Sequence, residues 1–178
     1  MVIAVADLRG RLLGLFRMPD ATVFSIDVAV AKARNMSFFV GPNRLPEDLP
    51  GVPPGTAVTN RTISFGAQPF YPAGIDGSGP GPFFQLYLND VDRPCGQGSQ
   101  PPDLNASGIV FFPGSLPLYR NGQLVGGLGI SGDGVEQDDL VAAGGATGFV
   151  PPEAIRADQV IVGGIRLPFL KFPRNPFE

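Results

Sequence analysis

The stretch FFPGSLPLYRNGQLVGGLGISGDGVEQDD, residues 111–139, contains the clearest local signals in this chain. At its centre lies Asn121-Gly122, a dipeptide typical of the two-residue turn between antiparallel strands, because both central positions of that turn need a positive φ angle. Apolar residues flank the dipeptide on either side. We therefore expect a β-hairpin here, with its two strands antiparallel.

A helix is expected directly after this hairpin, over residues 132–145 (GDGVEQDDLVAAGG). Asp133 is the expected N-cap and Glu136, three residues on, completes a capping box. Gly144 lies at the expected C-terminal end of the helix.

The spacing within this helix predicts which side chains face inward. At 100° per residue, Gln137 shares a face with Leu140, Val141 and Gly144, whereas Asp139 points away from them. We therefore expect Gln137 to meet the core or a pocket, and Asp138 to lie on a solvated flank.

A second hairpin is expected at the start of the chain. The apolar runs VIAVA (residues 2–6) and LLGLFRM (residues 12–18) are joined by DLRGR, in which Asp7 and Gly10 suit a tight turn. No internal repeat is visible in the sequence.

The next segment, SIDVAVAKARNMSFF at residues 25–39, is expected to form a helix. Ser25 is the expected N-cap, and Gly41-Pro42 follows the end of the helix. Its apolar residues form two roughly opposite faces, so we expect cover on both sides. Lys32 falls between these faces and is expected to snorkel or to pair with an acid.

The remainder of the chain is rich in proline and glycine. Residues 41–108 are expected to form a long ordered loop insertion that folds back onto the body, because disordered linkers seldom contain so many aromatic residues. Residues 151–178 are expected to hold a strand near 159–163 and a tail punctuated by prolines. We predict a single domain over 1–178 of the α+β class, with a central antiparallel sheet flanked by helices.

Composition excludes several function classes. The chain has no histidine, so it lacks the Ser-His-Asp and Cys-His machineries, histidine-bearing zinc sites and histidine-ligated haem. Cys95 is the single cysteine, so no internal disulfide can form. The basic residues are scattered and the net charge is -3, so no nucleic-acid partner is expected. No apolar run reaches the roughly 18 residues of a membrane span.

The glycines of this stretch match two known motifs only superficially. Gly127-x-Gly129-x-x-Gly132 fits the dinucleotide-binding fingerprint, but that motif needs a parallel strand-helix-strand unit, and here the strand belongs to a hairpin. Residues 129–133 nearly fit a nucleophile elbow, yet the last glycine is missing and no histidine could activate Ser131. Two explanations remain open for the glycines: close packing of a helix on the sheet, or a ligand lying on bare backbone.

Two further alternatives concern the start of the helix at 132–145. The amides of residues 131–134 could hold an anion such as a carboxylate, or Asp133 could cap them itself. The four acids Asp133, Glu136, Asp138 and Asp139 could hold a metal, or they could simply complement the positive end of the helix.

Three segments together resemble the GlcG/HbpS family, which includes the C-terminal domain of the PduO proteins. The stretch 111–139 is similar to the signature of that family, SIDVAVAKAR to its first core helix, and VIAVADLRGRLLGLFRM to its opening hairpin. The resemblance implies an antiparallel sheet flanked by helices in the profilin-like style, frequent oligomers, and binding of haem or corrinoid-type ligands in some members.

Two departures from this family pattern stand out. Members usually have a helix before the first hairpin, whereas this sequence begins at the strand, so either the start was removed or a partner covers that sheet face. The histidine that ligates haem in some members is absent. Other conventional haem ligands remain: Tyr71, Tyr87, Tyr119, Met18, Met36, Cys95 and Lys32.

We therefore predict a non-catalytic domain that binds a small ligand, with haem or another tetrapyrrole as the leading candidate. Its pocket is expected between the glycine-rich strand, the 131–137 turn and aromatic residues of the long loop. The expected site residues are Gly127, Gly129, Ser131, Gly132, Asp133, Gly134, Glu136, Gln137, Lys32, Tyr71 and Phe84. The alternatives are a structural or oligomerisation module without ligand, and an enzyme that uses acids or a metal. We also expect the protein to form a homo-oligomer.

Overall fold

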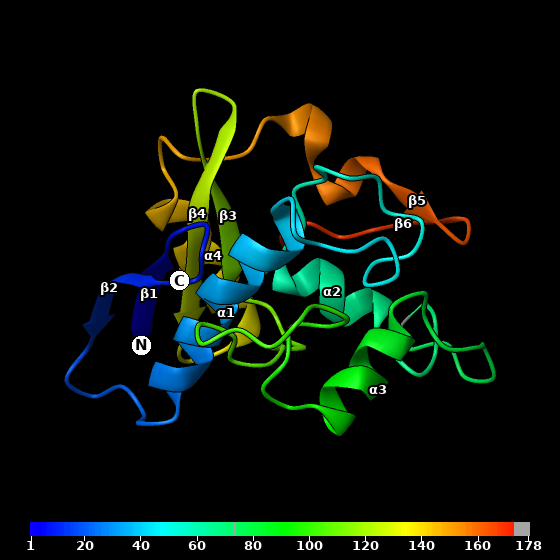
Figure 1. Ribbon diagram of the computed structural model, residues 1–178, viewed down its shortest axis with the longest axis horizontal. Helices are drawn as coiled ribbons and strands as arrows, with labels where there is room; N and C mark the ends of the chain where they lie inside the picture. Colours follow the sequence, from blue (N-terminus) through cyan, green and yellow to red (C-terminus); the bar gives the residue numbers. More distant parts are fainter. Residues whose placement is uncertain (73, 173–178) are drawn as a thin grey trace.

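The fold is built on a four-stranded antiparallel sheet with strand order β2-β1-β4-β3 (Figure 1). In this computed structural model, which describes residues 1–72 and 74–172, the strands are β1 (Val2–Ala6), β2 (Leu12–Arg17), β3 (Ser115–Arg120) and β4 (Gln123–Ser131). Both predicted hairpins are confirmed, and β1 joins them by pairing with β4. The predicted α+β class with a central antiparallel sheet is therefore confirmed.

The two hairpin turns follow from their sequences. Asn121 and Gly122 both have positive φ angles, of 52° and 75°, as the predicted two-residue turn requires. In the first hairpin, the Asp7 carboxylate accepts hydrogen bonds from the backbone N–H groups of Arg9 and Arg11, at 2.8 and 2.9 Å. Side-chain bonding of this kind is why aspartate favours tight turns.

Helix α1 (Ser25–Val40) packs on one face of the sheet, mainly against β4 and β1. It is nearly enclosed, because residues 31–33 and 35–40 are all buried. The prediction of cover on both sides is therefore confirmed. The predicted N-cap is wrong: Phe24 holds that position in a helical conformation, and Ser25 lies inside the first turn, where its hydroxyl pairs with that of Thr22 at 2.7 Å.

Helix α4 (Val135–Gly145) lies on the opposite face of the sheet from α1. Successive residues of a strand point to opposite faces; Gly129 of β4 faces α1, whereas the adjacent Leu128 faces the end of α4. The capping box is wrong, because Gly134 is the N-cap and Asp133 is exposed.

The predicted orientation of α4 is also wrong. Asp138, Asp139 and Ala142 are buried, whereas Gln137 and Gly144 are exposed. Apolarity alone did not identify the inner face of α4, because this face contacts two cations. Lys32 pairs with Asp138, and Arg61 pairs with Asp139.

Residues 41–108 contain two helices that the sequence did not predict, α2 (Asn60–Gly66) and α3 (Phe84–Asp92). Helix α2 begins with a capping box between Thr59 and Thr62. Phe83 is fully buried in the core. The aromatic residues therefore do bring this segment back onto the body, as expected.

The C-terminal part is mostly irregular. It contains two short 3-10 helices, η1 (Glu153–Ile155) and η2 (Ala157–Gln159), and a small separate hairpin of β5 (Ile161–Val162) and β6 (Ile165–Arg166). The strand predicted at 159–163 is thus reduced to β5. Of the predicted tail, 173–178 lie outside the described residues. No helix in the described ranges is long and apolar enough to cross a membrane.

Candidate functional site

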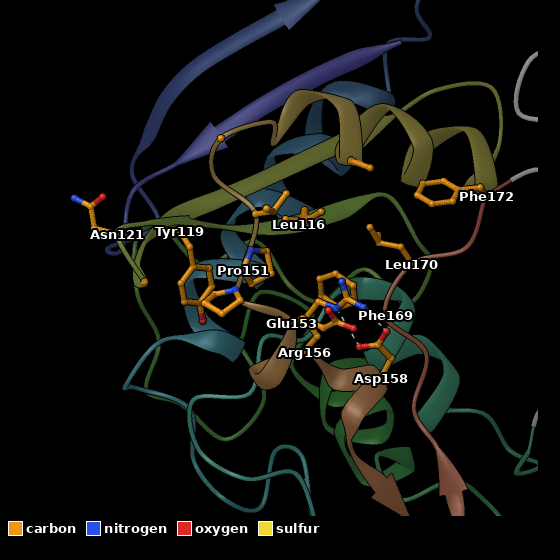
Figure 2. Close-up of a pocket in the computed structure, with 15 residues that line it drawn as sticks. Leu116, Tyr119, Asn121, Pro151, Glu153, Arg156, Asp158, Phe169, Leu170 and Phe172 are labelled. Atoms are coloured by element: carbon orange, nitrogen blue, oxygen red, sulfur yellow. Dashed lines mark hydrogen bonds and ion pairs between the residues drawn. The ribbon is translucent and has the colours of Figure 1, made fainter.

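A pocket of about 670 Å³ opens between the β3–β4 hairpin, the end of α4 and the C-terminal segment (Figure 2). Segments far apart in the sequence form its walls: β3, the loop after α4, and the chain near η1, η2 and residue 169. Its volume lies within the range of roughly 300–1,000 Å³ that small-molecule sites occupy. The lining residues are Leu116, Tyr119, Asn121, Gly122, Ala143, Gly148, Val150, Pro151, Pro152, Glu153, Arg156, Asp158, Phe169, Leu170 and Phe172.

Tyr119 is the one phenol among these lining residues. Its side chain is 6% exposed, and its hydroxyl forms no hydrogen bond with any described residue. Burial raises the pKa of Tyr119 above the ordinary value, because the charged phenolate is poorly solvated there. The pocket thus holds a neutral phenol whose hydrogen-bonding capacity is not used by any of the described residues.

An ion pair lies at one edge of the pocket (Figure 2). Arg156 donates to Asp158 through two nitrogens, Nε to Oδ1 at 3.1 Å and Nη2 to Oδ2 at 2.8 Å. The guanidinium also lies 5.2 Å from the centroid of the Phe169 ring. The hydrogen bond from Arg156 is the main reason why the pKa of Asp158 is lowered. Glu153 adds a second carboxylate to this edge.

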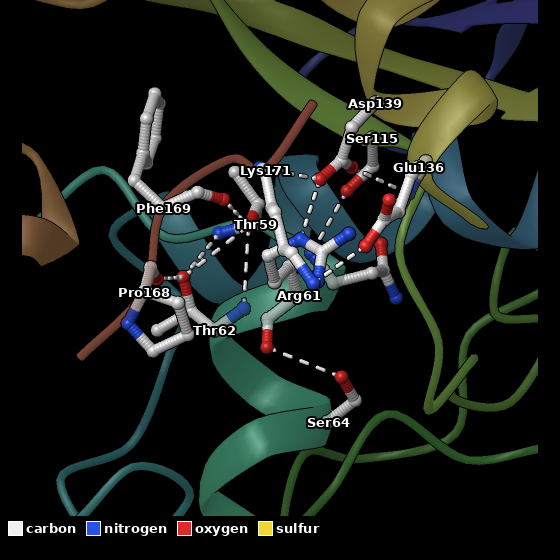
Figure 3. Close-up of polar contacts among 12 residues, drawn as sticks. Thr59, Arg61, Thr62, Ser64, Ser115, Glu136, Asp139, Pro168, Phe169 and Lys171 are labelled. Carbon is white, nitrogen blue, oxygen red and sulfur yellow. Dashed lines mark hydrogen bonds and ion pairs between the residues drawn. The ribbon is translucent and has the colours of Figure 1, made fainter. Parts of the chain in front are cut away.

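A buried ionic cluster holds the segment that carries Phe169 in place (Figure 3). Asp139 is fully buried and accepts hydrogen bonds from Arg61 Nε at 2.5 Å and from the backbone N–H groups of Gly114 and Lys171, both at 3.0 Å. Burial is the main cause that raises the pKa of Asp139. Since α2, α4 and the 168–171 segment meet at this carboxylate, it fixes the position of one pocket wall.

Two threonines of the α2 capping box add to this attachment. The Thr59 hydroxyl donates to the Phe169 carbonyl at 2.6 Å, and the Thr62 hydroxyl donates to the Pro168 carbonyl at 2.7 Å. At the outer side of the cluster, Lys171 Nζ lies 2.6 Å from Glu136 Oε1. The pattern T-N-R-T at residues 59–62 was the sequence signal that could have revealed this helix start.

Lys32 belongs to another buried ion pair. Its side chain is fully buried, and Nζ donates to Asp138 Oδ2 at 3.0 Å and to the Ile130 carbonyl at 2.6 Å. The ammonium also lies 4.8 Å from the centroid of the Phe112 ring. Desolvation lowers the pKa of Lys32 and raises that of Asp138. Of the two alternatives expected for Lys32, snorkelling or pairing with an acid, the structure shows the pair with an acid.

The residues predicted to form the ligand site lie in separate places. Gly127 and Gly129 are covered by α1, so the close-packing explanation describes the structure at these positions. Along the turn, Ser131 is buried at the end of β4, whereas Gly132, Asp133 and Gln137 are exposed. None of these residues lines the 670 Å³ pocket.

The remaining predicted site residues are also dispersed. Gly134 is the N-cap of α4. Tyr71 donates its hydroxyl to the Val162 carbonyl at 3.1 Å. Phe84 lines a separate pocket of about 400 Å³ and stacks on Tyr87, with ring centroids 5.8 Å apart. Within residues 1–72 and 74–172, no group of three or more acids or cysteines is arranged to hold a metal ion.

The family of this chain follows from its sequence match. A family model described as haem degrading protein HbpS-like matches residues 1–147. The chain belongs to the HbpS-like family. The resemblance inferred from the two hairpins and their helices is thereby confirmed.

The chain is also similar to a curated protein and to solved structures. An uncharacterized 15.0 kDa protein of the dhaT-dhaS intergenic region of Citrobacter freundii is 50% identical over 38 residues, which are 21% of this chain and 27% of that protein. The crystal structure of Klebsiella pneumoniae protein ORFY is similar with a TM-score of 0.53 and 26% identity, covering 83% of this chain and 73% of that chain. The crystal structure of a PduOC:heme complex is similar with a TM-score of 0.53 and 28% identity, covering 83% and 77%.

The pocket combines the HbpS-like part of the chain with a segment outside it. Leu116 and Tyr119 lie within the matched residues 1–147, whereas Arg156 and Phe169 lie beyond them. Tyr119 is among the haem ligands expected from the sequence, whereas its neighbours across the pocket, Arg156 and Phe169, are not among the expected site residues. Those neighbours lie in irregular chain, where periodicity gives no information about which way a side chain points.

Proposed function

We propose that this HbpS-like protein is a non-catalytic domain that binds haem or another tetrapyrrole in the 670 Å³ pocket. The observation that carries the proposal is Tyr119, a buried phenol with no hydrogen-bond partner among the described residues, set in a largely apolar pocket. The similarity to a PduOC:heme complex supports this choice of ligand.

The residues of the pocket fit a haem group in two respects. A tyrosine oxygen is one of the known axial ligands of haem iron, and the chain offers no histidine. Apolar side chains such as Leu116, Phe169 and Leu170 would cover the macrocycle. Bound haem would supply an iron centre, and Tyr119 would hold it.

The charges at the pocket edge define how the ligand would be held. Arg156 and Asn121 can donate hydrogen bonds to the carboxylates of a tetrapyrrole, but Glu153 and Asp158 line the same edge. Apolar contact and the Tyr119 oxygen, rather than a charge match, would therefore provide most of the binding free energy.

Tyr119→Phe is expected to weaken the binding of hemin by about tenfold or more, since losing even an outer-shell partner of a metal ligand costs that much. Absorbance titration of the wild type should give a saturable Soret shift with one hemin per chain. The melting temperature should rise with hemin, because a ligand that binds only the folded state stabilises it. Tyr87→Phe, at an exposed tyrosine outside this pocket, is the matched control.

The pH dependence of the same titration tests the role of the phenol. Because burial raises the pKa of Tyr119, binding of iron by its oxygen must release a proton. The affinity of the wild type should then rise by about tenfold per pH unit over the range where the phenol is protonated. A flat pH profile together with an unchanged affinity in Tyr119→Phe would exclude this site, and a non-saturating response would exclude tetrapyrrole binding.

A second candidate function, assembly with further copies of the chain, is favoured by β2. This edge strand is exposed along all its residues, and Leu13 and Phe16 are 65% and 61% exposed. An edge strand that is apolar and carries no charge between its ends offers free backbone groups to another strand.

Phe16→Lys is expected to shift the protein from a self-associated form to a monomer, because a charge on the edge strand opposes strand pairing. Light scattering after size-exclusion chromatography, over a range of concentrations, measures the mass. Val23→Lys places the same charge on another exposed side chain outside β2 and should leave the mass unchanged. A wild type that is monomeric at every concentration would rule out this function.

A further inference from the structure

A second pocket, of about 460 Å³, lies on the sheet beside β2, on the same face as α4. It is a groove across this face of the sheet, with β2 and β1 on one side and the β3–β4 hairpin on the other. Val5, Leu13, Leu118, Val125 and Phe149 form most of its walls. In residues 1–72 and 74–172, no residue lines both this groove and the pocket of Tyr119.

The groove leaves much apolar surface to solvent. Leu13 is 65%, Val125 40% and Phe149 38% exposed. Apolar side chains gathered around a concave surface indicate a binding site more strongly than scattered exposed ones do. An apolar group that filled this groove would remove these side chains from contact with water, and its binding would therefore be favourable.

Among the described residues, Arg120 is the only charged one that lines the groove. It is exposed, and its guanidinium forms no hydrogen bond or ion pair with any described residue. This differs from Arg61 and Arg156, each of which is paired with an aspartate. None of the described lining residues of this groove has a carboxylate, whereas Glu153 and Asp158 line the pocket of Tyr119.

We propose that the groove binds a single-chain amphiphile with a carboxylate head, the class to which fatty acids belong. The guanidinium of Arg120 binds the carboxylate, since arginine recognises this planar group through paired hydrogen bonds. The alkyl chain lies against Val5, Leu13 and Val125. Charge complementarity favours this ligand, because the groove is apolar and has one unpaired cation, Arg120. A fatty acid likewise has one negative charge at the end of an apolar chain.

A calorimetric titration with three probes tests this proposal: laurate, its uncharged methyl ester, and acetate, each below the concentration at which micelles form. Laurate should bind saturably with one molecule per chain. The ester and acetate should bind at least about tenfold more weakly than laurate. The ester lacks the charged carboxylate, and acetate lacks the long alkyl chain. Equal binding of laurate and its ester would overturn the role of Arg120.

Two variants locate the site on the folded protein. Arg120→Gln should weaken laurate binding about tenfold through loss of the charged hydrogen bonds, and Val125→Asp should abolish it. Arg166→Gln removes an exposed arginine elsewhere and should bind laurate like the wild type. Far-ultraviolet circular dichroism and melting curves verify that each variant is folded. Unchanged laurate binding in Arg120→Gln and Val125→Asp would overturn the proposal.

The same titrations separate this site from the other two functions. Hemin binding should be unaffected by Arg120→Gln. If the wild type binds laurate but does not bind hemin, the proposed haem site at Tyr119 is wrong and the proposal for the groove still stands. If a second copy of the chain filled the groove instead, Val125→Asp would lower the mass in solution and laurate would bind only as the oligomer dissociates. That result would overturn the proposal.

Discussion

Gly129→Ala is expected to lower the free energy of unfolding by about 3 kcal/mol, the upper end of the usual cost of overpacking a core. A Cβ atom at this position would lie within 3.0 Å of the Ala29 carbonyl oxygen and the Ala33 nitrogen. Both are backbone atoms of α1, which cannot move aside as a flexible side chain could. The helix would have to lift from the sheet along its most extensive contact, the one between α1 and β4.

Urea unfolding followed by circular dichroism measures this loss. Gly14→Ala is the matched control, because Gly14 lies in β2 of the same sheet and nothing lies within 4 Å of an added Cβ. That variant should be as stable as the wild type or slightly more so, since alanine restricts the unfolded chain. Equal stability of the two variants would mean that α1 does not rest on the backbone of β4 as described.

Asp139→Asn is expected to lower the free energy of unfolding by about 3–5 kcal/mol, the usual effect of removing one partner of a buried ion pair. Asp139 is fully buried and accepts hydrogen bonds from Arg61, Gly114 and Lys171. An amide has about the same shape, but its NH₂ group would face donors, and the Arg61 charge would lose its counter-ion.

Thermal and urea unfolding of this variant are compared with Asp133→Asn. Asp133 lies near the start of α4 and is exposed, so its change should stay within about 0.5 kcal/mol. Because Asp139 also fixes the 168–171 segment, hemin affinity should fall in Asp139→Asn under conditions where the protein remains folded. A stability loss no larger than that of Asp133→Asn would contradict the buried cluster.

The helix around Asp139 shows where reasoning from sequence failed. The wheel placed Gln137 inward and Asp138 on a solvated flank, because it ranked side chains by apolarity. In the structure Lys32 and Arg61 lie beneath this face, and their charges make aspartates the residues that fit there. These cations come from α1 and α2, more than 75 residues away in sequence, and no local pattern contains that information.

The predicted caps failed for a related reason. Ser25 and Asp133 are residues that favour the N-cap, yet the N-cap of each helix lies one position away, at Phe24 and at Gly134. Capping preference is worth about 1 kcal/mol, which is less than the packing energy that sets where a helix meets a sheet. At Thr59 the capping box did form, in a segment where the sequence analysis expected only loop.

The sequence by itself determined both hairpins, the helices α1 and α4, the class of the fold and the family, because turn dipeptides and apolar periodicity act over a few neighbouring residues. Only the tertiary structure decided which acids are buried, and that Tyr119 faces Arg156 and Phe169 across one pocket. Those contacts join segments separated by tens of residues. Their formation depends on how the sheet, the helices and the irregular C-terminal chain pack together, which no local pattern specifies.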